Sequence, residues 1–170
     1  VMDHPKFVSG NITTAFIAEE YPEGFDGVSL DEDSLRRIAA SAAAMHRVAE
    51  IRRTRVSGRM DNHERHVGEA WVVSLQGRDF AVSIAADREG STVSFEDGST
   101  LRVASRWTPG DSLARLDVGG DPLVLKVGKI SGGFRIRSRG ADLKVHVRTP
   151  RQAELASLMP EKLPPDTSKM

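Results

Sequence analysis

The stretch that decides the fold is residues 34–50, SLRRIAASAAAMHRVAE. Its apolar residues recur at alternating steps of three and four, the spacing that places side chains on one face of an α-helix. These residues are Leu35, Ile38, Ala42, Met45 and Ala49. Small apolar side chains fill much of the remaining circumference, at Ala39, Ala40, Ala43, Ala44 and Val48. A helix that is apolar around most of its girth is usually buried on several sides, and its small side chains let other backbone come close.

The expected helix has recognisable ends. An acidic cluster precedes it, and Asp31, Asp33 or Ser34 can cap its amino end, where the helix dipole favours negative charge. We therefore expect the helix to begin near Leu30 and to end near Thr54. Residues 1–30 are predicted to be mostly irregular, with a short helix or strand at residues 11–17.

From Glu69 onward the hydrophobic period changes from helical to two, the period of β-strands. The pattern predicts eight strands, at residues 70–76, 78–85, 92–95, 100–105, 113–118, 122–129, 134–138 and 143–148. Short turns rich in glycine and aspartate separate them, which is typical of an antiparallel meander, and eight strands can close into a small barrel. The predicted fold is therefore α+β, a long central helix wrapped by an antiparallel, roughly eight-stranded β-barrel. Pro150 then permits a short amphipathic helix.

Composition excludes several classes of function. The 170 residues carry 24 basic and 24 acidic side chains, so no global field attracts nucleic acid or a membrane surface. Without cysteine there is no disulfide, no thiolate nucleophile and no cysteine-ligated zinc. No apolar run approaches the roughly 20 residues that span a bilayer. The amino end has neither a signal pattern nor a methionine at position 1, so we expect the chain to begin within a larger one.

Positive charge is concentrated in the last strands. Between Lys126 and Arg151, eight basic residues stand against a single acidic one, Asp142. The eight are Lys126, Lys129, Arg135, Arg137, Arg139, Lys144, Arg148 and Arg151. A solvated strand face and a surface that meets an acidic partner both fit this pattern.

The connection between the helix and the first strand is unusually long. Residues 52–68 show no clear periodicity, and loops of this length within a compact domain are usually functional or disordered. Arginine and histidine are frequent in it: Arg52, Arg53, Arg55, Arg59, His63, Arg65 and His66. It is the candidate partner-binding segment, and a flexible loop is the alternative.

Residues suited to catalysis form only weak patterns. His63 and His66, with Asp61 and Glu64, could supply metal ligands, but a loop pair lacks the fixed geometry of two histidines on one helix. His46 is expected to be a packed or partly exposed helix residue. The glycine pairs at 119–120 and 132–133 lie between strands and are predicted to be turns, and Trp71 and Trp107, at strand positions, to be core or barrel-rim residues. We expect no catalytic residue and no metal or cofactor site in this chain.

Two stretches carry a resemblance to a known family. Residues 6–17, KFVSGNITTAFI, followed by YPEGF at 21–25, resemble the end of the biotin carboxylase domain in propionyl-CoA carboxylase α subunits. The alanine-rich helix, the eight strands and the tail KLPPDTS at 162–168 are similar to the region that follows there, the BT domain. The resemblance implies three parts: 1–28, the end of a biotin carboxylase domain; 29–150, a BT domain; and 151–170, a short helix and linker towards a biotinyl domain.

The resemblance also implies a function. BT domains are non-catalytic and join the biotin carboxylase part to the carboxyltransferase β subunit, so the implied partners are that subunit and the biotin carboxylase and biotinyl domains of the same subunit. It places the β-subunit contact on residues 52–68, where arginine suits an interface because its planar fork makes paired hydrogen bonds. The parent enzymes are ligases that use ATP, biotin and Mg or Mn, in the bacterial cytoplasm or the mitochondrial matrix. No ATP-binding part is present here, and Ser168 stands where the biotin-attachment motif has a methionine, so Lys169 is not expected to carry biotin.

Two other functions remain possible at this point. A small β-barrel can bind a lipid or acyl ligand in its interior, although a buried helix would fill that space. The basic stretch between Lys126 and Arg151 could bind nucleic acid, but such surfaces interleave aromatic residues, and the only one here, Phe134, is predicted to point inward. We expect neither nucleic acid nor a membrane as a partner.

Overall fold

The computed structural model describes residues 4–24, 28, 30–55 and 66–159. Its helices are α1 (Pro5–Val8), α2 (Phe16–Glu20), α3 (Glu32–Thr54) and α4 (Pro150–Ser157). Its strands are β1 (Ala70–Leu75), β2 (Arg78–Ala86), β3 (Ser91–Phe95), β4 (Thr100–Ser105), β5 (Leu113–Val118), β6 (Asp121–Ile130), β7 (Gly133–Ser138) and β8 (Ala141–Arg148). The strands pair antiparallel in chain order, and β8 returns to β1, so they form a closed barrel.

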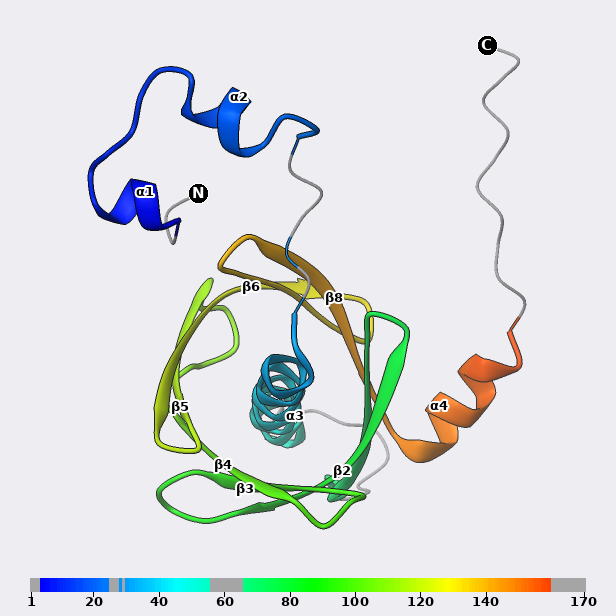
Figure 1. Cartoon of the computed structure of the whole chain (residues 1–170). Helices are drawn as coiled ribbons and strands as arrows, with labels where there is room; N and C mark the ends of the chain where they lie inside the picture. Colours follow the sequence, from blue (N-terminus) through cyan, green and yellow to red (C-terminus); the bar gives the residue numbers. More distant parts are fainter. Residues whose placement is uncertain (1–3, 25–27, 29, 56–65, 160–170) are drawn as a thin grey trace.

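Helix α3 packs against this barrel along much of its length. It has 23 residues, and Figure 1 shows it inside the ring of strands, where it contacts every strand from β1 to β5 as well as β7 and β8. Ala39, Ala40, Ala42 and Ala43 have no exposed surface at all. Alanine suits these positions because larger side chains would hold the strands away from the helix. The predicted combination of an eight-stranded antiparallel barrel with a helix packed against it is confirmed.

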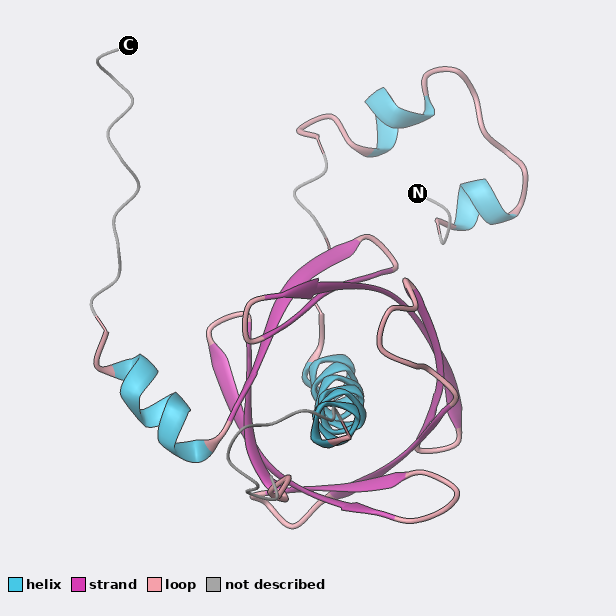
Figure 2. Cartoon of the chain, turned by 180° about the vertical axis from the view of Figure 1, so that it is seen from behind, coloured by secondary structure: helices cyan, strands magenta, loops and turns pink. Residues whose placement is uncertain are grey.

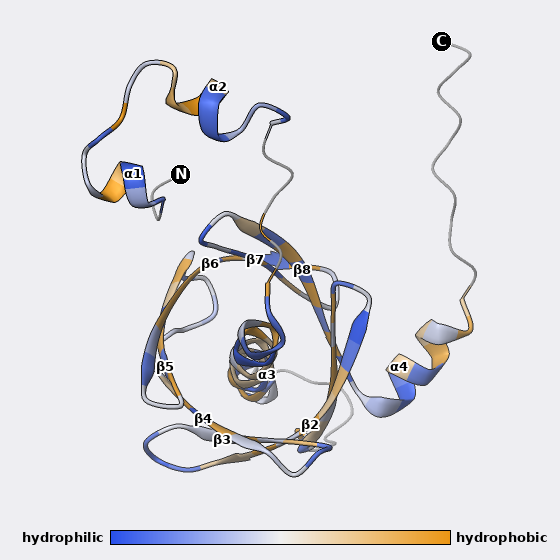
Figure 3. Cartoon of the chain, in the orientation of Figure 1, coloured by the Kyte–Doolittle hydropathy of each residue, from blue (hydrophilic) through white to orange (hydrophobic). Residues whose placement is uncertain are grey.

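The barrel wall follows from residue alternation. Figure 3 shows hydrophobic and hydrophilic residues alternating along the strands, and the hydrophobic ones face the helix. In β7, for example, Phe134 and Ile136 are buried while Arg135 and Arg137 are exposed. Side chains of the helix and of the strands together form one core inside the barrel. Among the described residues, no helix is long and apolar enough to span a membrane.

Two of the seams between strands are short. β1 pairs with β8, and β4 with β5, over three positions each. Helix α4 packs on β1 and β8 from outside the ring, as Figure 2 shows. A capping box fixes its start, in which the side chains of Thr149 and Gln152 each accept a hydrogen bond from the other's backbone amide. The helix permitted by Pro150 is thus confirmed, and it covers the seam where the barrel closes.

Most element boundaries agree with the sequence predictions, with two corrections. The short element expected at residues 11–17 is replaced by two short helices, α1, which begins at Pro5, and α2, which begins at Phe16. All eight strands occur within two residues of their expected limits, and Asp31 caps α3 by accepting a hydrogen bond from the Ser34 amide at 2.9 Å. Trp107, however, does not lie in a strand, because β4 ends at Ser105. It is buried in the loop that follows, where its indole nitrogen donates to the carbonyl of Asp111 at 2.9 Å. The division of the chain at residues 28 and 150 stays a prediction.

The amino end of α3 is tied to the barrel by Asp97, in the β3–β4 turn. Its carboxylate accepts hydrogen bonds from the backbone amide and hydroxyl of Ser99, at 3.0 and 2.6 Å, and pairs with Arg36 of the helix at 2.6 Å. These Ser99 bonds, and then Arg36, lower the pKa of Asp97 to about 2. Turn geometry and helix position are therefore coupled through one carboxylate.

The Asp97→Asn variant is expected to be less stable than the parent chain at pH 7 but not in acid. The folded-state pKa lies below the unfolded value of about 3.9, so the ionised carboxylate stabilises the fold above that pH and stops doing so as the pH falls through 2. The difference in Tm between the two proteins should therefore shrink between pH 4 and pH 2. Thermal unfolding followed by circular dichroism measures it, and a difference that stays constant over this range would contradict the assignment.

Candidate partner-docking site

The two ends of the long connection are fixed to each other through aromatic packing. His46, two turns before the end of α3, lies 4.8 Å from the ring of Trp71, the second residue of β1, in an edge-on arrangement. The indole nitrogen of Trp71 donates to the carbonyl of Gly68 at 3.1 Å, which holds the chain just before β1. The connection therefore starts and ends on parts of the barrel that are rigid relative to each other.

A buried carboxylate lies within the same region. The side chain of Glu50 is 5% exposed, its carboxylate accepts a hydrogen bond from Arg53, and it is 3.9 Å from the ring nitrogen of His46. Because the carboxyl end of a helix carries partial negative charge, a carboxylate there is unfavourable unless cations compensate it. Arg53 supplies this compensating charge, and Glu50 orients its guanidinium group.

The loop after β4 closes against this end of the helix. Arg52 donates to the carbonyl of Pro109 at 3.1 Å. Asp111 accepts from the Thr108 backbone amide at 2.9 Å and hydroxyl at 3.0 Å, and these bonds lower the pKa of its carboxyl group. The loop is thereby held in one conformation, and it forms a wall beside the helix end.

A cavity of about 260 Å³ opens between the helix end, this loop and the β6–β7 turn. The rings of His46, Trp107 and Phe134 line it, with Trp107 and Phe134 edge-on at 5.8 Å. Arg53 and Lys129 supply positive charge to its lining. An apolar hollow with cationic side chains can receive an apolar side chain next to a carboxylate.

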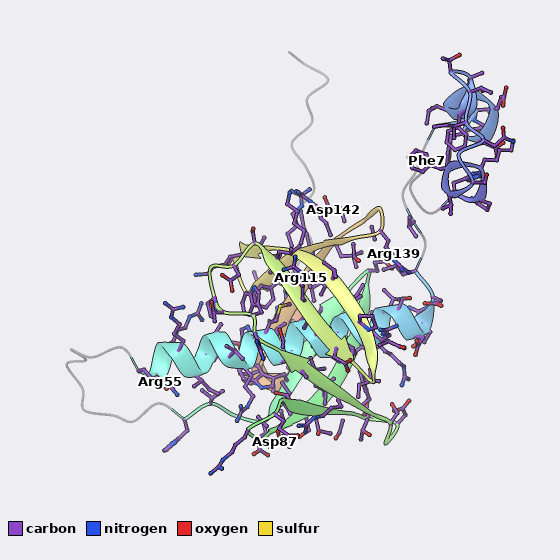
Figure 4. All side chains as sticks on the ribbon, turned by 90° about the vertical axis from the view of Figure 1, so that its left-hand side faces the viewer. Phe7, Arg55, Asp87, Arg115, Arg139 and Asp142 are labelled. Carbon is purple, nitrogen blue, oxygen red and sulfur yellow. The ribbon has the colours of Figure 1, made fainter. Side chains whose placement is uncertain are left out.

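The structure places four of the seven predicted site residues. Arg52 and Arg53 form the last turn of α3 and Arg55 follows as its carboxyl cap, while His66 lies exposed shortly before β1. Figure 4 shows Arg55 at the end of α3 that projects beyond the strands. The remaining three, Arg59, His63 and Arg65, lie outside the described residues. Arg53 pairs with Glu50, a contact that the sequence analysis did not predict.

Sequence reasoning missed several residues of this region. Glu50, Trp107, Lys129 and Phe134 come from four different elements, and only the closed barrel brings them together. One signal was readable, since Glu50 stands four residues after His46 and three before Arg53, the spacings at which helical side chains meet. A buried glutamate at the root of the connection could have been inferred from it.

The other candidate chemistries have little support. Of the proposed metal ligands, Asp61, His63 and Glu64 lie outside the described residues, and the described part of the chain contains no group of three or more His, Cys, Asp or Glu side chains placed to hold an ion. Residues 119–120 form a turn between β5 and β6, as predicted, whereas of the second pair only Gly132 lies in a turn, because Gly133 is the first residue of β7 and pairs with Ile130. Phe134 points into the barrel and is buried, also as predicted.

Comparison with known proteins gives a consistent result. The family model described as the propionyl-coenzyme A carboxylase BT domain matches residues 38–162. The propionyl-CoA carboxylase alpha chain of Ruegeria pomeroyi is 82% identical over all 170 residues, which cover 25% of that protein. The mitochondrial propionyl-CoA carboxylase alpha chains of Rattus norvegicus and Homo sapiens are each 30% identical, over all of this chain and 24% of their own length. The chain thus spans about a quarter of the length of these relatives.

Proposed function

This chain belongs to the family of propionyl-coenzyme A carboxylase BT domains, and we propose on that basis that it is a non-catalytic assembly domain. In this proposal it joins the biotin carboxylase part of an α subunit to the carboxyltransferase β subunit of an acyl-CoA carboxylase, with propionyl-CoA as the substrate of the whole enzyme. The biotinyl domain of the same subunit would follow residues 160–170. Because relatives include a bacterial protein and mitochondrial ones, the compartment would be the bacterial cytoplasm or the mitochondrial matrix.

The observation that carries the proposal is the rigid, cationic root of the helix–strand connection. Arg52, Arg53 and Arg55 stand at one side of it and His66 at the other, on a barrel whose core is formed by α3 and the apolar strand residues packed on it. Rigid roots limit the conformations of the segment between them, so less entropy is lost when it binds. Barrel and helix therefore act together as a platform that presents this segment to a partner.

The residues of this chain do not fit the cofactors of the parent enzymes. Ser168 and Lys169 do not reproduce the biotin-attachment motif, and the described residues form no metal-binding group. In the proposal, biotin, ATP and Mg or Mn belong to other parts of the enzyme, which load biotin from ATP and bicarbonate. The contribution of this chain is positional, since it sets where the tethered biotin can travel.

Sedimentation velocity of this chain mixed with the carboxyltransferase β subunit tests the proposal. We expect the two to form a complex that sediments faster than either protein alone. The same experiment with the full-length α chain is the control for contacts that need further domains. If neither the domain nor the full-length chain forms a complex while circular dichroism shows both partners folded, the assembly role is wrong.

A further inference from the structure

The outward face of β6, β7 and β8 carries a dense group of cations at a distance from the docking site. Lys126, Arg135, Arg137 and Lys144 all point away from the helix, and all are exposed. We call these four residues the basic face. Figure 4 shows Asp142, the acidic residue among them, projecting from the outside of the barrel. The sequence predicted positive charge here, and the structure shows which of the charges share one surface.

The register of the strands places like charges directly opposite each other. Lys126 pairs with Arg137 across β6 and β7, and Arg135 pairs with Lys144 across β7 and β8. Directly opposed like charges destabilise a sheet, whereas opposite charges at such positions stabilise it. Among the described residues, neither Lys126 nor Lys144 has a carboxylate within ion-pair distance. The opposed like charges therefore do not stabilise the fold by themselves, whereas an anionic surface placed against them would interact with them favourably.

Asp142 holds the two arginines in place without neutralising the face. Its carboxylate accepts hydrogen bonds from Arg135 at 2.7 and 2.6 Å and from Arg137 at 3.0 Å. These bonds, first from Arg135 and then from Arg137, lower the pKa of Asp142 to about 2, so it stays ionised at neutral pH. One carboxylate thus fixes two guanidinium groups and leaves one net positive charge among the three. Pre-oriented arginines lose less side-chain entropy on binding.

Exposed apolar side chains and a strand glycine adjoin the cations on the outward face. Val124 and Leu113, on the outward side of β6 and β5, are 51% and 42% exposed. Gly128, opposite Arg135, leaves the backbone of β6 uncovered. A Cβ added there would fit, because its nearest neighbour, the Arg135 carbonyl oxygen, would be 3.8 Å away. By contrast, an added Cβ at Gly133 would lie 2.0 Å from the Val145 carbonyl oxygen. Glycine at 133 is a steric necessity, whereas at 128 a side chain would fit; a strand glycine of that kind occurs at bulges, at bends of barrel strands and where another backbone approaches closely.

We propose that the basic face is a second docking surface, for a folded protein domain whose surface is acidic and brings an apolar side chain to Val124. Charge complementarity and exposed aliphatic side chains favour a protein over nucleic acid, because the face has no aromatic residue for base stacking and has a carboxylate, Asp142, beside Arg137. The inference rests on the proposed assembly role and adds a surface to it. The partner would be another domain or subunit of the same assembly.

Lysine footprinting tests the proposal in the complex of the full-length α chain with the carboxyltransferase β subunit. An amine-acetylating reagent followed by mass spectrometry measures the modification rate of each lysine in the complex and in the isolated 170-residue chain. We expect Lys126 and Lys144 to react at least about fivefold more slowly in the complex, because interface cores exclude solvent and reagent. Lys129, which lines the cavity at the docking site, reports separately on the β-subunit contact.

Three variants sharpen the test. Gly128→Val in the full-length chain should restore the isolated-chain rates at Lys126 and Lys144, because its side chain blocks close approach while suiting a strand. Ala81→Ile adds the same three carbons at an exposed position of β2 and is the matched control, expected to leave protection unchanged. Lys144→Glu should raise the Tm of the isolated chain by about 1–3 °C, because it turns a like-charge pair with Arg135 into an opposite-charge pair.

The outcomes separate the two proposals. If Lys129 is protected but Lys126 and Lys144 react at their isolated-chain rates, the basic face is not a docking surface while the assembly role stands. If no complex forms, the assembly role is wrong, and the second surface with it. If nuclease treatment of the complex abolishes the protection, the partner is nucleic acid and the inference is overturned. Protection that survives nuclease and is lost in Gly128→Val supports the acidic protein partner.

Discussion

Ala43→Leu is expected to lower the free energy of unfolding by about 3 kcal/mol, towards the upper end of the range for overpacking a core. Ala43 has no exposed surface and lies on the helix that fills the barrel, where helix and strands are in contact. Three additional carbon atoms can be accommodated only by moving the helix away from one side or by straining the closed ring of strands. A closed barrel resists that movement because each strand is hydrogen-bonded on both sides.

The measurement is thermal or urea unfolding of the isolated chain. A loss of this size corresponds to a Tm lower by roughly 6–12 °C for a chain of this length. Val48→Leu, on an exposed part of the same helix, is the control and should change the free energy by less than about 0.5 kcal/mol. Equal stability of the Ala43→Leu and Val48→Leu proteins would mean that the helix is not tightly enclosed.

The fold was largely predictable because two periodicities divide the chain. Steps of three and four placed Leu35, Ile38 and Met45 on one helical face, and all three are buried in the structure. Alternation in β7 and β8 likewise identified the inward residues. Closure of the barrel could not be predicted in the same way. It depends on the pairing of β1 with β8, which joins Val73 to Val147 and extends over only three positions. Pairing between distant segments depends on the whole ring and leaves no local periodicity to read.

The candidate site was predictable in position but not in composition. Length and arginine content drew attention to residues 52–68, yet the sequence could not show that Arg53 pairs with the buried Glu50. It also could not show that Trp107 leaves β4 and turns back to line a cavity, because a tryptophan next to alternating residues looks like a strand residue. Both features depend on contacts between separate elements. The basic face shows the same limit: total charge was readable, and the direct opposition of Lys126 and Arg137 required the strand register.

Arg55→Glu and His66→Glu are each expected to weaken association with the carboxyltransferase β subunit by about 30-fold or more. The two residues stand at the two ends of the connection, and both are exposed. Arg55→Glu reverses a charge, and His66→Glu introduces a negative one. Placing an unmatched charge where an interface buries a complementary group costs about 2–5 kcal/mol, and 2 kcal/mol corresponds to roughly 30-fold in the dissociation constant. Because the change is electrostatic, the loss should be largest at low ionic strength and smaller in high salt.

Stability and association are separable in this test. A glutamate at position 55 is unfavourable at the carboxyl end of α3, but such dipole effects amount to about 0.3–1 kcal/mol and leave the barrel folded. Arg78→Glu makes the same change in charge as Arg55→Glu at an exposed site in β2, beside Glu32 at the opposite end of α3, and should bind as the parent chain does. Sedimentation velocity titrations at two salt concentrations compare the three variants. If Arg55→Glu and His66→Glu bind no more weakly than Arg78→Glu, the β subunit contacts a different part of the domain, and the rigid helix–strand root serves the fold rather than the assembly.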